Sequence, residues 1–75
     1  MWEKEFKKLR MNLGRNIKSI RLEQGLAQER LALDAGVDRT LVSKIERLIA
    51  NPSLEILTKL ATVLDVSVTR LLADK

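Results

Sequence analysis

The chain is 75 residues long, which suits a single small domain spanning residues 1–75. It has neither cysteine nor histidine, which excludes disulfides and thiolate or imidazole metal sites. The net charge is +4, and residues 1–30 hold all of the excess, with eight Lys or Arg against four acids. This balance favours a polyanionic partner. Because no apolar run approaches about 18 residues and no signal-peptide pattern opens the chain, we expect a soluble cytoplasmic protein without a membrane span.

Apolar residues recur every three or four positions along the first third of the chain and predict an amphipathic helix. They are Trp2, Phe6, Leu9, Leu13, Ile17 and Ile20. Gly25 ends the pattern, and Gly14 leaves open one long helix or two with a break near residues 12–14. Residues 1–12 are an N-terminal extension of this helix. We expect Trp2, Phe6 and Leu9 to cap the domain's own core, with a contact in a dimer as the alternative.

Residues 28–47 contain two short helical patterns separated by a turn at Gly36. The apolar positions are Leu31, Ala32 and Ala35 in the first segment, then Leu41, Val42 and Ile45 in the second. Asp38 is a good N-cap for the second segment, which runs through Arg47. Two short helices joined in this way form a helix-turn-helix, a motif that places its second helix in the major groove of DNA.

The C-terminal part of the chain predicts two further helices. After a loop over 48–52, a helix begins near Ser53, and Ser67 caps a short last helix. The residues expected to face inward are Leu54, Leu57, Leu60, Ala61 and Leu64 in the former, with Val68, Leu71 and Leu72 in the latter. Because no segment alternates as a strand does, the sequence predicts an all-α domain of five helices.

The run from Leu13 to Leu72 resembles the Xre/Cro family of phage-repressor-like helix-turn-helix domains. The matching pieces are LGRNIKSIRLEQGLAQERLALDAGVDRTLVSKIER, NPSLEILTKLATVLDVS and RLL, in the family's order and over about four fifths of the chain. Within the family, the size and the string VDRTLVSKIER are similar to restriction–modification controller proteins, which are small dimeric autoregulators. The resemblance implies a five-helix repressor-like DNA-binding domain.

The outer face of the helix over 39–47 is the predicted reading surface. Val42 and Ile45 face the core, so the polar residues take the other side. The resemblance places base-reading residues at Arg39, Thr40, Ser43 and Lys44. Arg and Lys can pair with guanine, and a threonine methyl can meet the thymine methyl. The alternative is a polar face that is only solvated.

Other residues take supporting roles by the same resemblance. Gln28 at a helix start contacts a phosphate and braces the recognition helix. Further phosphate contacts are expected from Arg47, Asn51 and Ser53. For Asn51 and Ser53, a role as helix caps alone is the alternative. Arg21 and Glu46 form a partly buried ion pair that ties the first helix to the end of the recognition helix.

Two positions depart from the family pattern. Ala27 stands where Ser or Thr usually caps the second helix, so a stabilising cap is missing. Leu48 stands where Gly commonly ends the recognition helix. The loop is therefore expected either to end without a left-handed residue or to extend the helix by part of a turn. Residues 48–50 are expected to fill the gap between the third and fourth helices, or else to form a protein-binding surface.

These observations predict a homodimeric transcriptional regulator on a palindromic operator, with an autoregulatory role in a restriction–modification system. A dimer places two recognition helices about 34 Å apart. The expected dimer residues are Ile56, Val63, Val66, Val68, Leu71 and Leu72, of which the last two could belong to the core instead. RNA polymerase is a further candidate partner. No cofactor, metal, small-molecule substrate or enzymatic activity is expected, and the location is the bacterial cytoplasm at the nucleoid. The alternative function is an antitoxin-type or other repressor that mainly binds a protein.

Overall fold

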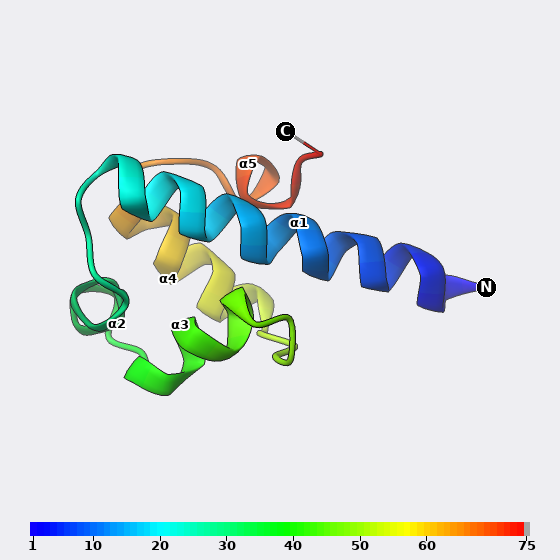
Figure 1. The fold of residues 1–75 in the computed structure, drawn as a ribbon, viewed down its shortest axis with the longest axis horizontal. Helices are drawn as coiled ribbons and strands as arrows, with labels where there is room; N and C mark the ends of the chain where they lie inside the picture. Colours follow the sequence, from blue (N-terminus) through cyan, green and yellow to red (C-terminus); the bar gives the residue numbers. More distant parts are fainter. Residues whose placement is uncertain (75) are drawn as a thin grey trace.

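A computed structural model describes residues 1–74, which fold into five helices without a strand among them (Figure 1). In chain order they are α1 (Trp2–Glu23), α2 (Gln28–Ala35), α3 (Arg39–Glu46), α4 (Leu54–Leu64) and α5 (Val68–Leu72). The predicted all-α, five-helix fold is therefore confirmed. The predicted domain includes Lys75, which lies outside the described residues. Within residues 1–74, no helix has the length and apolar character needed to cross a membrane.

The first helix is continuous over 22 residues, so the alternative of a break near residues 12–14 is wrong. Gly14 has a packing role instead. A Cβ atom at this position would lie 2.6 Å from Leu48 Cδ2 and 2.8 Å from the carbonyl oxygen of Ile45. The absence of a side chain lets α1 approach the end of α3 closely, which offsets the modest helix propensity of glycine.

A single aliphatic core joins all five helices. Its buried residues are Leu13, Ile17, Ile20, Leu31, Ala32, Val42, Ile45, Ala50, Leu57, Leu60, Ala61, Leu64 and Leu71. Most of the predicted inward positions are among them. Leu54 is the exception, because it is 71% exposed at the first turn of α4, where no other helix covers it. The prediction that Leu54 faces inward is wrong.

The apolar stripe of α1 changes character along the helix. From Leu13 onward it is buried, Phe6 and Leu9 are half-buried, and Trp2 is 67% exposed. The first turns of α1 extend past the other helices (Figure 1), and the aromatic contact of Trp2 is with Phe6 on the same helix, at 6.0 Å between ring centroids. The expectation that Trp2 caps the core is therefore wrong, and only Phe6 and Leu9 approach that role.

Short polar side chains begin three of the helices as local chemistry predicts. The carboxylate of Asp38 accepts from Thr40 N, and the Ser53 and Ser67 hydroxyls accept from Ile56 N and Arg70 N. Ala27 has extended backbone at the start of α2 and no side-chain bond to it. The predicted loss of the α2 cap is thus confirmed.

Leu48 ends the recognition helix in a way that neither sequence alternative described. Its φ is +65°, in the left-handed region that glycine normally takes. Its N–H donates to the Ile45 carbonyl at 3.1 Å, and the N–H of Ile49 donates to the Lys44 carbonyl at 3.0 Å. These two bonds are the Schellman arrangement, so α3 stops as it would at glycine. The following Ala50 is buried and fills the gap before α4, whereas Ile49 is 60% exposed.

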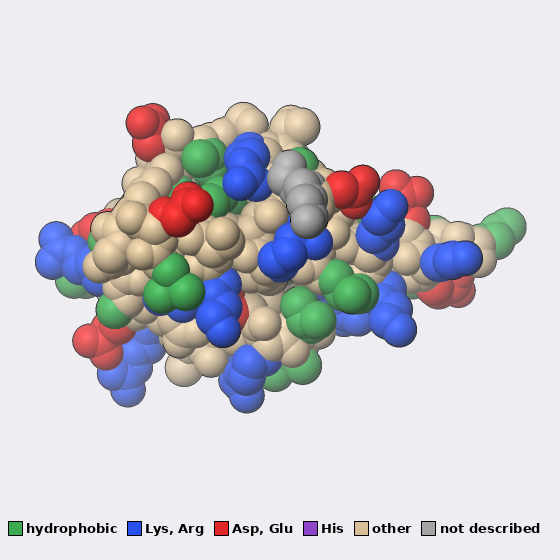
Figure 2. Space-filling view, turned by 45° about the horizontal axis from the view of Figure 1, so that its top comes forward, with side chains coloured by type: hydrophobic (Ala, Val, Ile, Leu, Met, Phe, Trp, Pro, Cys, Tyr) green, Lys and Arg blue, Asp and Glu red, His purple; other side chains and the backbone are tan. Residues whose placement is uncertain are grey.

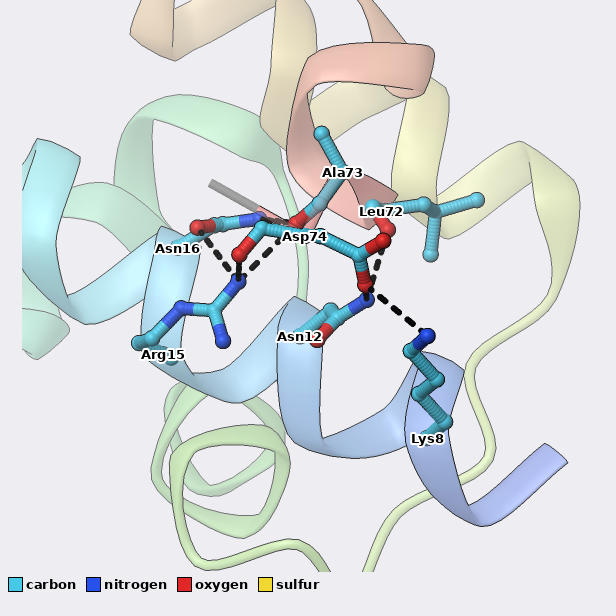
Figure 3. A network of polar contacts seen from close by, with 7 residues as sticks. All are labelled: Lys8, Asn12, Arg15, Asn16, Leu72, Ala73 and Asp74. Carbon is cyan, nitrogen blue, oxygen red and sulfur yellow. Dashed lines mark hydrogen bonds and ion pairs between the residues drawn. The ribbon is translucent and has the colours of Figure 1, made fainter. Parts of the chain in front are cut away.

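Amide side chains of α1 hold the end of α5 (Figure 3). The Asn16 amide donates to the carbonyls of Arg70, Leu71 and Ala73, at 2.7 Å in the last case. The Asn12 amide donates to the Leu72 carbonyl at 3.1 Å and to Asp74 at 3.0 Å. Arg15 adds bonds to the carbonyls of Ala73 and Asp74. We call Asn12, Arg15 and Asn16 the α5 clamp, which no pattern in the sequence indicated.

Candidate nucleic-acid interface

The start of α3 is fixed by Asp38. One carboxylate oxygen accepts from the backbone N of Thr40 at 2.9 Å and from its hydroxyl at 2.8 Å. These bonds, together with the positive charges of Lys44 and Arg39, hold the pKa of Asp38 below its ordinary value. The carboxylate therefore remains charged at the helix N-terminus, where the helix dipole favours a negative charge.

The four predicted base-reading residues lie together on α3. Arg39, Thr40 and Lys44 are exposed and Ser43 is half-buried, whereas Val42 and Ile45 behind them are 0% and 2% exposed. The spacing of an α-helix places these polar residues along one side, opposite the two core residues. The buried pair anchors α3 in the domain, so its outer face is presented by a firmly packed helix.

A shallow hollow lies beside this face, between the first turn of α2 and α3. It is lined by Gln28, Glu29, Arg39, Thr40 and Ser43. Across it, Arg39 pairs with Glu29 at 3.2 Å, and both side chains are about three-quarters exposed. An exposed pair of this kind contributes little to stability, so Arg39 can exchange Glu29 for another partner at low cost.

Behind α3, the predicted pair of Arg21 and Glu46 is present. Nε of Arg21 lies 2.8 Å from one carboxylate oxygen and Nη2 lies 3.0 Å from the other, which is a two-point contact. The side chains are 9% and 5% exposed. Arg21 also donates to the Leu26 carbonyl, and Gln28 Nε2 donates to Glu46 at 3.0 Å. Glu46 therefore joins α1, the start of α2 and the end of α3.

The remaining predicted phosphate contacts lie at or after the end of α3. Arg47 is the exposed C-cap residue of α3, and Asn51 and Ser53 are exposed in the segment before α4. The Ser53 hydroxyl caps α4 by accepting from Ile56 N at 3.2 Å. Asn51 borders an apolar pocket on the side of α1, away from the hollow beside α3.

The predicted dimer residues divide into two groups. Five are half-buried and pack against the edge of the core: Ile56, Val63, Val66, Val68 and Leu72. Leu71 is 0% exposed and belongs to the core, so it has no surface to offer a partner. The prediction of Leu71 as a dimer residue is therefore wrong. No group of three or more metal-ligating side chains occurs in the part of the chain that the structure describes.

Comparison with known proteins matches residues 17–71 to the helix-turn-helix family. The chain belongs to this family. The match begins inside α1 and ends in α5, so it covers the hollow, α3 and the ion pair behind it. The predicted resemblance to Xre/Cro-like helix-turn-helix domains is confirmed, and residues 1–12, predicted as an N-terminal extension, lie outside the match.

Several characterised relatives share the fold. The transcriptional regulator SinR of Bacillus subtilis is 47% identical over 64 residues, which are 84% of this chain and 58% of SinR. The structure of SinR in complex with DNA has a TM-score of 0.77 and 47% identity, covering 81% of this chain and 98% of that chain. The restriction–modification controller protein C.AhdI of Aeromonas hydrophila has a TM-score of 0.79 and 39% identity, covering 83% and 94%. The chain spans about three fifths of the length of SinR and of a Neisseria meningitidis relative, and a smaller share of other curated relatives.

Proposed function

We propose that the protein is a DNA-binding transcriptional regulator that reads base edges with the outer face of α3. The observation that carries this proposal is the exposed set of Arg39, Thr40 and Lys44 on a helix anchored from behind by Val42 and Ile45. Rigid presentation matters because base readout needs side chains held in register with the groove. The relative SinR, at 47% identity over 81% of this chain, has been solved in complex with DNA.

The chemistry of the face suits major-groove contacts. Arg39 and Lys44 can donate paired hydrogen bonds to guanine, and the Thr40 methyl can contact the thymine methyl. Ser43, half-buried beside the hollow, can bond to either base type. On binding, Arg39 exchanges its exposed partner Glu29 for a base.

Gln28 can brace α3 and contact a phosphate at the same time. Its amide nitrogen carries two N–H groups, and one of them donates to Glu46. The second is free for a phosphate oxygen, beside the uncapped N–H groups at the start of α2. Arg47, and less directly Asn51 and Ser53, supply further backbone contacts that set affinity and register.

The finer proposal is a homodimer on a palindromic operator, in an autoregulatory restriction–modification controller of the bacterial nucleoid. Two-fold pairing through Ile56, Val63, Val66, Val68 and Leu72 would join the half-buried apolar edge of α4 and α5 to its copy. The likeness to C.AhdI supports this role. Contact with RNA polymerase would be the route to activation.

A second candidate function is neutralisation of a protein partner. The exposed Ile49, at 60%, and Leu48, at 36%, form an apolar surface next to α3 that DNA reading does not explain. Co-purification of a stoichiometric partner that is lost in Ile49→Ser would support this function. Unchanged operator binding in Ile49→Ser would separate it from DNA reading.

The test of DNA reading is selection of binding sites from random DNA, followed by gel shifts with variants. Arg39→Ala and Lys44→Ala should each reduce the free energy of DNA binding by about 1–3 kcal/mol. Each should also relax specificity at the one base position that the removed side chain reads. Arg47→Ala should weaken binding to all sequences. It should also reduce the slope of log affinity against log salt concentration by about 1. Lys59→Ala, on the exposed side of α4, is the matched control and should change neither. Sequence-independent binding that survives the double substitution at 39 and 44 contradicts the proposal.

A further inference from the structure

The first turns of α1 form an arm that extends past the rest of the domain (Figure 1). We define residues 2–9 as the N-terminal arm and Trp2, Phe6 and Leu9 as the arm stripe. Trp2 is 67% exposed, and its ring centroid lies 6.0 Å from that of Phe6. Apart from this contact with Phe6, Trp2 is mostly exposed at the end of a projecting helix, so most of its apolar area is available to another molecule.

An apolar pocket opens at the base of the same arm. Its walls come from α1, the segment before α4, α4 and α5, and include Phe6, Leu9, Leu13, Pro52, Leu57 and Leu72. At its edge the Arg10 guanidinium lies 5.0 Å from the Phe6 ring centre, and Arg10 Nε is buried without a hydrogen-bond partner. The pocket therefore combines apolar walls with a guanidinium that stacks on one ring and has one N–H without a hydrogen-bond partner, which suits a second aromatic side chain.

We propose that this pocket receives Trp2 of a second copy, with two N-terminal arms packed antiparallel. Trp2 and the pocket residue Arg10 both lie on α1, separated by about 12 Å along its axis at 1.5 Å per residue. An antiparallel pair with its two-fold axis at Phe6 therefore sets each Trp2 opposite Arg10 of its copy. Because each pocket then holds the Trp2 side chain of the other copy, the contact is closed and symmetric. A parallel pair would set Trp2 against Trp2, away from either pocket.

The charges of the arm fit its own antiparallel copy. At helical spacing, Glu3 and Arg10 lie along one side of the arm stripe, and Glu5 and Lys8 lie along the other. In the antiparallel pair each side meets the same side of the copy with its direction reversed. With the two-fold axis at Phe6, Glu3 lies within one residue of the level of the copy's Arg10, and Glu5 lies within one residue of the level of the copy's Lys8, so each charge pair is within reach and occurs twice. Figure 2 shows this end of the molecule carrying basic and acidic side chains together. This self-complementarity favours a second copy over an unrelated protein.

The contact is a different surface from the α4–α5 edge and does not require DNA. Its residues lie mostly outside the segment that matches the helix-turn-helix family, residues 17–71. The arm would thus add a second self-contact and join regulators that occupy neighbouring sites. Trp2 is the single tryptophan of the chain, so its fluorescence reports this contact alone.

The experiment is a dilution series of the full chain without DNA, followed by tryptophan emission and sedimentation. Emission should shift to shorter wavelength as concentration rises, in step with association. In Trp2→Ala the self-contact should weaken by about tenfold or more, as is usual for a tryptophan at the centre of an interface. Leu33→Ala removes another large exposed side chain, from α2, and should leave the emission shift and its midpoint unchanged. Solvent-exposed emission at every concentration, or a short-wavelength emission that does not depend on concentration, overturns the proposal.

Charge exchange tests the antiparallel arrangement. Glu5→Lys and Lys8→Glu should each weaken the contact, because each sets like charges against each other across the pair. The double variant restores both pairs and should recover the wild-type midpoint. Both residues are exposed, and the ion pair with Asp74 that Lys8→Glu removes is exposed too and contributes little to stability, so the variants retain the fold. A double variant no better than the single variants overturns this arrangement.

Discussion

Two polar networks tie helices of this protein together, and they differ in kind. Behind α3, the buried Arg21–Glu46 pair joins two charged side chains, with Gln28 as a third member. In the middle of α1, the neutral amides of Asn12 and Asn16 hold backbone carbonyls of residues 70–73. The first network supports the proposed reading helix, and the second fixes the short α5.

The difference shows how a network depends on its partners. Removing one member of a buried ion pair leaves an uncompensated charge shielded from water, which strongly lowers the free energy of unfolding. Removing an amide from the α5 clamp leaves neutral carbonyls, some of which Arg15 still reaches or water can solvate. The ion pair should therefore tolerate substitution less well than the clamp.

The largest effect is expected from Glu46→Ala. Arg21, 7% exposed, would keep a buried charge without its carboxylate, and the free energy of unfolding should fall by about 3–5 kcal/mol. Urea denaturation followed by circular dichroism measures this loss. Glu29→Ala removes a carboxylate that pairs with an arginine at an exposed site, and it should cost less than about 1 kcal/mol. Equal losses in the two variants would contradict the contrast between buried and exposed pairs.

A smaller loss is expected from Asn16→Ala. Three carbonyls near the end of α5 lose a donor, so the free energy of unfolding should fall by about 1–3 kcal/mol. Asn16→Asp should be at least as harmful at neutral pH, because an ionised carboxylate cannot donate. Asn51→Ala is the control, since Asn51 is exposed, and it should change little in the same denaturation experiment. A stable Asn16→Asp would show that the amide does not hold α5.

A gain in stability is expected at the start of α2, where a side-chain cap is missing. Ala27 has the backbone of an N-cap but no side chain to accept from α2, so Ala27→Ser should raise the free energy of unfolding by about 1 kcal/mol. Ser67→Ala removes a cap that is present and should act in the opposite direction. Thermal unfolding of the two variants measures both changes in stability. A loss of stability in Ala27→Ser would mean that an α2 cap is incompatible with its surroundings.

The smallest effect is expected from acidification, through protonation of the Asp74 carboxylate. The Asn12 amide and the charge of Lys8 hold the pKa of Asp74 below its ordinary value of 3.8. A lowered folded-state pKa means that the stabilisation is complete above pH 3.8 and is lost as the pH falls below it. The difference in melting temperature between wild type and Asp74→Asn should therefore shrink on acidification through this range. Asp38, also with a lowered pKa, is present in both proteins and cancels. A difference that is constant with pH would contradict the contact.

Local chemistry explains most of what the sequence predicted correctly. Asp38 and Ser67 were expected to cap helices, and each accepts a bond from a nearby backbone N–H. Such bonds connect residues two or three positions apart, so they can be recognised in the sequence without the fold. Helical periodicity likewise identified most core positions of α1 to α4, with Trp2 and Leu54 as errors, each in the first turn of its helix.

The sequence by itself determined five helices, their caps and the polar face of α3, because each depends on spacing along the chain. Tertiary structure alone decided the left-handed Leu48, which closes against Gly14, and the exposure of Trp2 beyond the end of the other helices. It also decided the α5 clamp. The partners of Asn16 are backbone carbonyls more than fifty positions away, and every residue carries such a carbonyl, so no sequence pattern marks the one that is bound.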